Sequence, residues 1–245
     1  MAVVEAIASA DAPLRFGDLA RQVPQPKATL HRQISNLIEE GLIEARPDST
    51  YGLGVRLLKL AARSWSDSRF RLIAEPHLMQ LHKDTGETVH LGILQGVEVI
   101  YLDKVESKMS VRMHSQIGNA SPCYCTGVGK AALSALPLAR AEALASQITF
   151  VRHTPHTLTD ATALLAELET IRRTGISYDS EEHETGIHCI AAPVYSADRA
   201  LVAGLSVTAP TYRVQREQLD GWADLLLATT SAIMDDMNIR MGPKS

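Results

Sequence analysis

Polar side chains that bind bases and phosphates readily gather in one short stretch of the chain, between residues 27 and 36. Asn and Gln can pair with adenine edges, Arg with guanine, and Lys and Thr can hold phosphate oxygens. Residues 22–38 contain basic side chains but no Asp or Glu. The stretch therefore predicts a nucleic-acid contact, and its candidate residues are Lys27, Thr29, His31, Arg32, Gln33 and Asn36.

The three cysteines, Cys123, Cys125 and Cys189, form a second candidate group. An odd number is a poor basis for a disulfide framework and fits a reducing compartment. Thiolate and imidazole together suit zinc, so a zinc- or redox-responsive site that adds His183 and His188 stays open as an alternative. Against it, adjacent residues of a strand point to opposite faces, which would separate His188 from Cys189.

A thiol enzyme built from Cys125, Cys189, His183 and Asp179 would need a lowered thiol pKa, and the sequence gives no sign of one. We therefore expect no enzyme and, unless the zinc alternative holds, no bound cofactor or metal.

The elements around residues 27–36 indicate a winged helix-turn-helix. Pro26 suits the first turn of a helix, and Leu30, Ile34, Leu37 and Ile38 recur with the spacing of one buried stripe. Gly41 ends this helix. A short hairpin across residues 42–53, with Arg46 in its turn, then forms the wing as a further candidate DNA contact. We expect a DNA-binding domain over residues 1–54 and a linker helix over 55–68.

Residues 69–245 mix helical and alternating patterns, which indicates an α+β domain with an antiparallel sheet. Gln95-Gly96 is a hairpin signal between two strands. A further strand is expected over 110–118, and one long helix over 214–241 is expected to close the chain.

The bulk composition is that of a globular protein, with 45% hydrophobic and 21% charged residues. No apolar stretch approaches the length of a membrane helix, and the N-terminal segment lacks the features of a secretory signal. We expect a cytoplasmic protein without membrane contact. The net charge of −4 argues against indiscriminate coating of nucleic acid.

Several motifs resemble the IclR family of transcriptional regulators, in family order along nearly the whole chain. They are QVPQPKATLHRQISNLIEEGLIE, YGLGVRLLKLA, TGETVHLGILQGVEVIYLDKVES, TGVGKAALSALP, SYDSEEHETGIHCIAAPVY and GLSVTAP. Ala28 stands where the family usually has a phosphate-binding serine, and the resemblance implies that its position is a further DNA contact. The segment RMHSQIGNASPCYCTGVGK is most similar to the KdgR-like branch, which responds to a sugar acid.

The resemblance implies a GAF-like effector-binding domain whose ligand lies between the loop before the GK helix and the last strands. Carried over by motif, the effector-binding positions are Gly127, Val128, Asp179, Cys189, Ser206 and Thr208. Backbone N–H groups at a helix start can hold a carboxylate, and Ser206 and Thr208 share one face of a strand.

The resemblance thus predicts a DNA-binding regulator, a repressor rather than an activator, controlled by a small organic acid such as a sugar acid or keto acid. Its partners would be a double-stranded operator, the small carboxylate effector, and further copies of the chain in a homodimer or tetramer.

Overall fold

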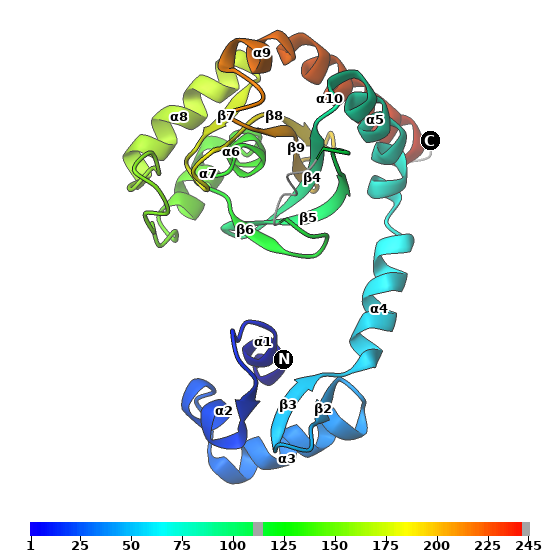
Figure 1. Cartoon of the computed structure of the whole chain (residues 1–245), viewed down its shortest axis with the longest axis vertical. Helices are drawn as coiled ribbons and strands as arrows, with labels where there is room; N and C mark the ends of the chain where they lie inside the picture. The colour runs from blue at the N-terminus through cyan, green and yellow to red at the C-terminus, as the bar shows by residue number, and fades with distance from the viewer. Residues whose placement is uncertain (110–114, 242–245) are drawn as a thin grey trace. The chain divides into compact units, whose positions relative to one another are not determined.

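The computed structural model describes residues 1–109 and 115–241, and the chain divides into two compact units, Met1–Ser68 and Arg69–Ser245 (Figure 1). Each unit has a hydrophobic core of its own. Within the described residues, no helix combines the length and apolar character needed to cross a membrane.

The first unit is a winged helix-turn-helix. Its elements are α1 (Ala2–Ala8), β1 (Leu14–Arg15), α2 (Phe16–Gln22), α3 (Lys27–Glu39), β2 (Ile43–Ala45), β3 (Thr50–Leu53) and α4 (Val55–Ser66). The three short strands pair antiparallel in the order β1-β3-β2. The predicted recognition helix and wing are therefore present in chain order.

The core of this unit lies under α3, where Leu30 and Ile34 are buried and Leu37 is partly buried. Ile38, which the sequence placed in the same stripe, is 38% exposed, so that prediction was wrong. Residues four apart on a helix drift around its axis by about 40°, because each residue turns by about 100°. Two such steps from Leu30 carry Ile38 past the edge of the small core.

The second unit is built on a six-stranded antiparallel sheet, as expected for an α+β fold. Its strands follow the order β6-β5-β4-β9-β8-β7, and the sheet is curled (Figure 1). The strands are β4 (Thr88–Gln95), β5 (Glu98–Val105), β6 (Ala120–Pro122), β7 (Ser177–Ser180), β8 (Ile187–Tyr195) and β9 (Val202–Pro210). The helices are α5 (Arg69–Thr85), α6 (Gly127–Ser134), α7 (Leu138–Ala145), α8 (Ala161–Thr174), α9 (Arg216–Gly221) and α10 (Ala223–Met241).

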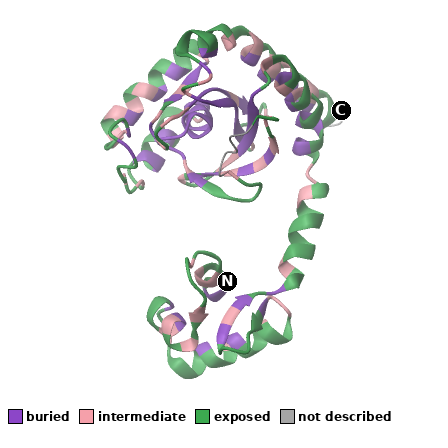
Figure 2. Cartoon of the chain, in the orientation of Figure 1, coloured by how far each residue is buried: buried purple, intermediate pink, exposed green. Residues whose placement is uncertain are grey.

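The two faces of the sheet are covered differently. Val89, Leu91, Leu205 and Val207 belong to the large core that includes side chains of α5 and α10. On the opposite face α6 packs directly on the strands, and a Cβ at Gly204 would overlap the backbone of Val128. Buried residues are accordingly concentrated in the sheet and α6 (Figure 2).

The structure bears on two further expectations from the sequence, one for a strand and one for a helix. Of the strand expected over 110–118, residues 110–114 lie outside the described residues, and residues 115–118 form no strand. The single closing helix expected over 214–241 is two helices, because α9 ends at Gly221 and the Trp222 N–H donates to the Leu219 carbonyl before α10 begins.

Candidate functional site

The exposed face of α3 carries most of the predicted DNA contacts. Six of them, Lys27, Ala28, Thr29, His31, Arg32 and Asn36, are exposed. Helical geometry places Ala28, Arg32 and Asn36 one turn apart, opposite the buried Leu30 and Ile34. This arrangement presents a guanidinium and an amide on a helix that can enter a major groove.

Two of the predicted contacts, Gln33 and His31, already interact with other residues of the first unit. Gln33 is partly buried, and its Oε1 accepts a hydrogen bond of 2.7 Å from Gln25 Nε2. The ring of His31 lies 5.5 Å from that of Phe16. Arg46 on the wing is exposed, with its Nε 3.7 Å from Glu44 Oε1.

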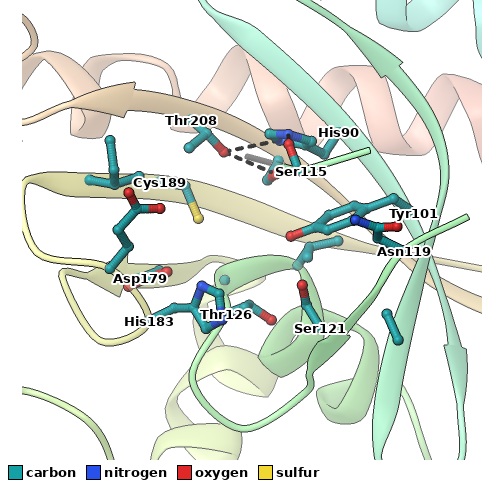
Figure 3. Close-up of a pocket in the computed structure, with 16 residues that line it drawn as sticks. His90, Tyr101, Ser115, Asn119, Ser121, Thr126, Asp179, His183, Cys189 and Thr208 are labelled. Atoms are coloured by element: carbon teal, nitrogen blue, oxygen red, sulfur yellow. Dashed lines mark hydrogen bonds between the residues drawn. The ribbon is translucent and has the colours of Figure 1, made fainter. Parts of the chain in front are cut away.

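A cavity of about 160 Å³ opens on the α6 face of the second unit (Figure 3). The structure brings all six predicted effector positions, Gly127, Val128, Asp179, Cys189, Ser206 and Thr208, to its walls. Ten further residues complete the lining: His90, Tyr101, Ser115, Asn119, Ala120, Ser121, Thr126, His183, Glu184 and Ile187.

Strand pairing explains why residues far apart in sequence meet there. Asp179 pairs with Cys189, and Cys189 with Thr208, in one row across β7, β8 and β9. In the adjacent row Ser206 pairs with His90 of β4. Paired residues of antiparallel strands point to the same face, so these side chains all project toward the cavity.

The start of α6 forms the floor of the cavity beside these rows. The Thr126 side chain caps the helix by accepting from the Gly129 N–H at 3.3 Å and donates to the Pro122 carbonyl at 2.8 Å. A Cβ at Gly127 would overlap Cys189 Sγ, so only glycine allows the helix start to lie against this thiol. The positive end of the helix dipole therefore faces the cavity.

His90 is the most connected of the lining residues that sequence reasoning missed. Its Nδ1 lies 3.2 Å from Thr208 Oγ1 and its Nε2 lies 2.7 Å from Ser115 Oγ. Figure 3 shows the ring near Thr208 and Ser115, while Tyr101 and Asn119 lie on the side away from Asp179. The alternation of Thr88, His90 and Gly92 along one strand was the available signal, but its use required the register with β9.

Burial determines the charge states of the titratable groups in the cavity. It raises the pKa of Asp179 to about 7 and lowers the pKa of His90 to about 3. It also raises the pKa of Cys189 and of Tyr101 to about 12 in each case. At neutral pH the imidazole of His90, the thiol and the phenol are thus uncharged.

Asp179 is held by the loop that follows β7. Its Oδ1 accepts a hydrogen bond of 2.7 Å from the Glu182 N–H. The Glu182 side chain in turn accepts from Lys130 Nζ at 2.5 Å, and Glu167 Oε1 lies 3.4 Å from the same nitrogen. This buried ion pair ties the loop to α6 and fixes the wall that carries Asp179.

The zinc or redox alternative gains no support from this geometry. Across residues 1–109 and 115–241, no three His, Cys, Asp or Glu side chains are placed to hold a metal ion. Burial raises the pKa of Cys123 and Cys125, like that of Cys189, to about 12. Protonated, buried thiols are poor ligands and poor nucleophiles.

Comparisons with known proteins assign both units. Residues 1–47 match the model of the IclR helix-turn-helix domain, and residues 64–235 match that of the bacterial transcriptional regulator IclR C-terminal domain.

Two curated relatives come from Escherichia coli K12. The chain is 33% identical to the HTH-type transcriptional regulator XynR, over 87% of this chain and 85% of the relative. It is 31% identical to the HTH-type transcriptional regulator KdgR, over 90% of this chain and 84% of the relative. The crystal structure of the Thermotoga maritima IclR superposes with a TM-score of 0.72 at 28% identity, covering 98% of this chain and 96% of that one.

Proposed function

The chain belongs to the IclR family of DNA-binding transcriptional regulators, and on this premise we propose that it is a repressor whose operator occupancy is set by a small organic acid, a sugar acid or keto acid. A repressor of this kind acts in the cytoplasm, where its operator lies. The relatives and both family models describe regulators rather than enzymes.

One observation carries the proposal for the effector unit. Six positions from three separate parts of the sequence line one cavity of about 160 Å³ at the start of a helix. The hydroxyl groups of Ser206, Thr208 and Ser121, with the amide of Asn119, suit a ligand rich in hydroxyl and carbonyl oxygens. The volume of this cavity is close to that of a protein cavity that holds benzene, so the ligand must be a small molecule.

A thermal-shift screen of the reduced, full-length chain tests this half of the proposal. The probes are galacturonate for sugar acids, pyruvate for keto acids and 4-hydroxybenzoate for aromatic acids. An acid present at about 100 times its Kd adds about 2.7 kcal/mol to the free energy of unfolding, which shifts Tm measurably.

The variant Ser206→Ala is expected to reduce that shift, because it removes a hydroxyl from the cavity wall. Ser177→Ala is the matched control, since Ser177 Oγ is buried without a hydrogen-bond partner and does not line the cavity. Equal shifts in both variants would contradict the assignment of this cavity.

Binding of the chain to its own upstream DNA across a salt series tests the other half. Phosphate contacts release counterions, so affinity must fall as salt rises. Affinity that stays flat with salt would exclude the proposed α3 and wing contacts.

We also propose a homodimer joined through the first unit and α4, with a tetramer formed through the second unit. Leu58, Ala61, Ala62 and Trp65 recur along α4 at the spacing of one helical face, and Leu58 is 70% exposed. A two-fold dimer would place two recognition helices in successive major grooves of a palindromic operator.

A further inference from the structure

The cavity has an unusual charge balance for the binding of an acid. Asp179 is buried in its wall and the exposed Glu184 lies at its rim. Among the lining residues in the described ranges there is no Lys or Arg. Within the described part of the chain, an anion that enters therefore meets a carboxyl group and no lining lysine or arginine.

Two lysines with buried side chains lie near the cavity, and both are paired with carboxylates. Lys104 Nζ lies 2.8 Å from Glu106 Oε1 and donates to the carbonyl of the lining residue Ser115 at 2.7 Å. Lys130 Nζ lies 2.5 Å from Glu182 Oε1 and 3.4 Å from Glu167 Oε1. Two carboxylates share this one ammonium group. Lys130 is therefore already paired with carboxylates, and it does not line the cavity.

The two imidazoles on the walls do not supply a fixed positive charge either. Both ring nitrogens of His90 are within hydrogen-bond distance of hydroxyl groups, and the residue is buried. The pKa of His183 is lowered below its ordinary value, mainly by burial and to a smaller extent by the nearby His153. The start of α6 offers only about half a positive charge.

Resting on the function proposed above, we propose that the acid enters as an anion together with one proton, which Asp179 takes from the solvent and donates to the ligand in a hydrogen bond. The carboxylate of the ligand then lies between the α6 N-terminus and a neutral carboxyl group. Two carboxyl groups that share one proton avoid the repulsion of two adjacent anions.

The groups that face Asp179 come from five parts of the unit and favour proton uptake on balance. They are Glu182 and His183 from the loop after β7, Cys189 from β8, Lys130 from α6, Cys125 from the segment before α6, and Tyr101 from β5. Burial of Asp179 and the charge of Glu182 favour the neutral acid, whereas Lys130 and two backbone N–H groups oppose it. The cysteines and the tyrosine stay neutral.

Isothermal titration calorimetry on the full-length chain tests the proposal with pyruvate, galacturonate and 4-hydroxybenzoate between pH 6 and 8.5, where their carboxyl groups stay ionised. The Kd of an acid that binds is expected to rise by about tenfold for each pH unit above 7. Buffers of different ionisation enthalpy should reveal uptake of nearly one proton per chain above pH 8.

Asp179→Asn supplies a permanent hydrogen-bond donor, so its Kd is expected to be independent of pH and close to the wild-type value at pH 6. Asp198→Asn is the matched control, because this exposed aspartate lies in the β8–β9 hairpin, outside the cavity. It should keep the wild-type pH dependence.

A wild-type Kd that is flat with pH, without proton uptake, would overturn this inference and leave the proposed function standing. Loss of binding at every pH in a folded Asp179→Asn would also overturn the inference, since Asp179 would then act as an acceptor. Failure of all three acids to bind wild type would overturn both proposals.

Discussion

At the scale of single residues, Arg32 and Asp179 occupy opposite surroundings. Arg32 lies exposed on α3, where solvent keeps its charge and leaves its five donors available. Asp179 is buried in the cavity wall, where the same solvent is excluded and its charged form is disfavoured. The role that we propose for each residue rests on this difference in exposure.

We predict that Arg32→Ala weakens operator binding by about 1–3 kcal/mol, because a bidentate contact to guanine would be lost. Fluorescence anisotropy with labelled operator DNA measures the change. Arg173→Ala removes the same charge from an exposed position on α8 in the second unit and should leave the affinity almost unchanged. Equal losses in the two variants would point to net charge rather than to α3.

The buried Asp179 also predicts how stability depends on pH. Its pKa is about 7 in the folded chain, against about 3.9 when unfolded, so between these values the folded state holds a proton that the unfolded state lacks. Its contribution to the free energy of unfolding therefore falls as pH rises from about 4 to 7.

Between pH 5.5 and 8 this loss amounts to about 2 kcal/mol. Urea unfolding followed by circular dichroism measures the free energy of unfolding at the two pH values. Its decrease from pH 5.5 to pH 8 should be smaller in Asp179→Asn than in wild type by this amount. A drop of the same size in both would mean that Asp179 is ionised throughout.

At the scale of elements, the join between the wing and α4 depends on Gly54. Its N–H donates to the Leu42 carbonyl at 2.9 Å, and a Cβ at this position would overlap the Gly41 carbonyl. Backbone cannot yield as a flexible side chain can, so any larger residue must separate the wing from α3.

We predict that Gly54→Ala destabilises the first unit by about 1–3 kcal/mol, the usual cost of overpacking. Differential scanning calorimetry would show a lower first transition, with weaker operator binding. Gly17→Ala in α2 is the control in the same unit, because a Cβ there meets nothing within 4 Å and alanine favours helix. An unchanged transition in Gly54→Ala would mean that the wing join is not rigid.

Local sequence patterns and family motifs predicted many helices and strands, but few of the tertiary contacts between them. Pro26, the apolar spacing and Gly41 were enough to predict α3, and the motifs placed six residues at the cavity. His90 was missed because it lines the cavity only through its pairing with Ser206, which is 116 positions away. The alternation of Leu205, Ser206, Val207 and Thr208 indicates the two faces of β9, but it does not reveal which strand pairs with it.

At the scale of the whole molecule, α4 has no buried residue within one chain. An isolated helix of 12 residues is marginal in water, so we expect partner contacts to stabilise it. Leu58→Asp should shift the chain from dimers toward monomers in analytical ultracentrifugation and weaken operator binding.

Leu60→Asp is the control, because Leu60 is also exposed but lies on the other side of α4. It should leave the dimer intact. If both variants stay dimeric, the contact lies outside this face of α4.

The two-sided sheet has a consequence for how such a regulator can change over generations. Alternate residues of β4 and β9 face the packed helices on one side and the cavity on the other. Under the proposed function, mutations at His90, Ser206 or Thr208 would therefore alter which molecule is recognised, while Val89, Leu205 and Val207 keep the fold stable. Ligand preference could then change among descendants of one ancestor while the fold is kept. Alternate residues of the same strands serve the two purposes, one set lining the cavity and the other packing in the core.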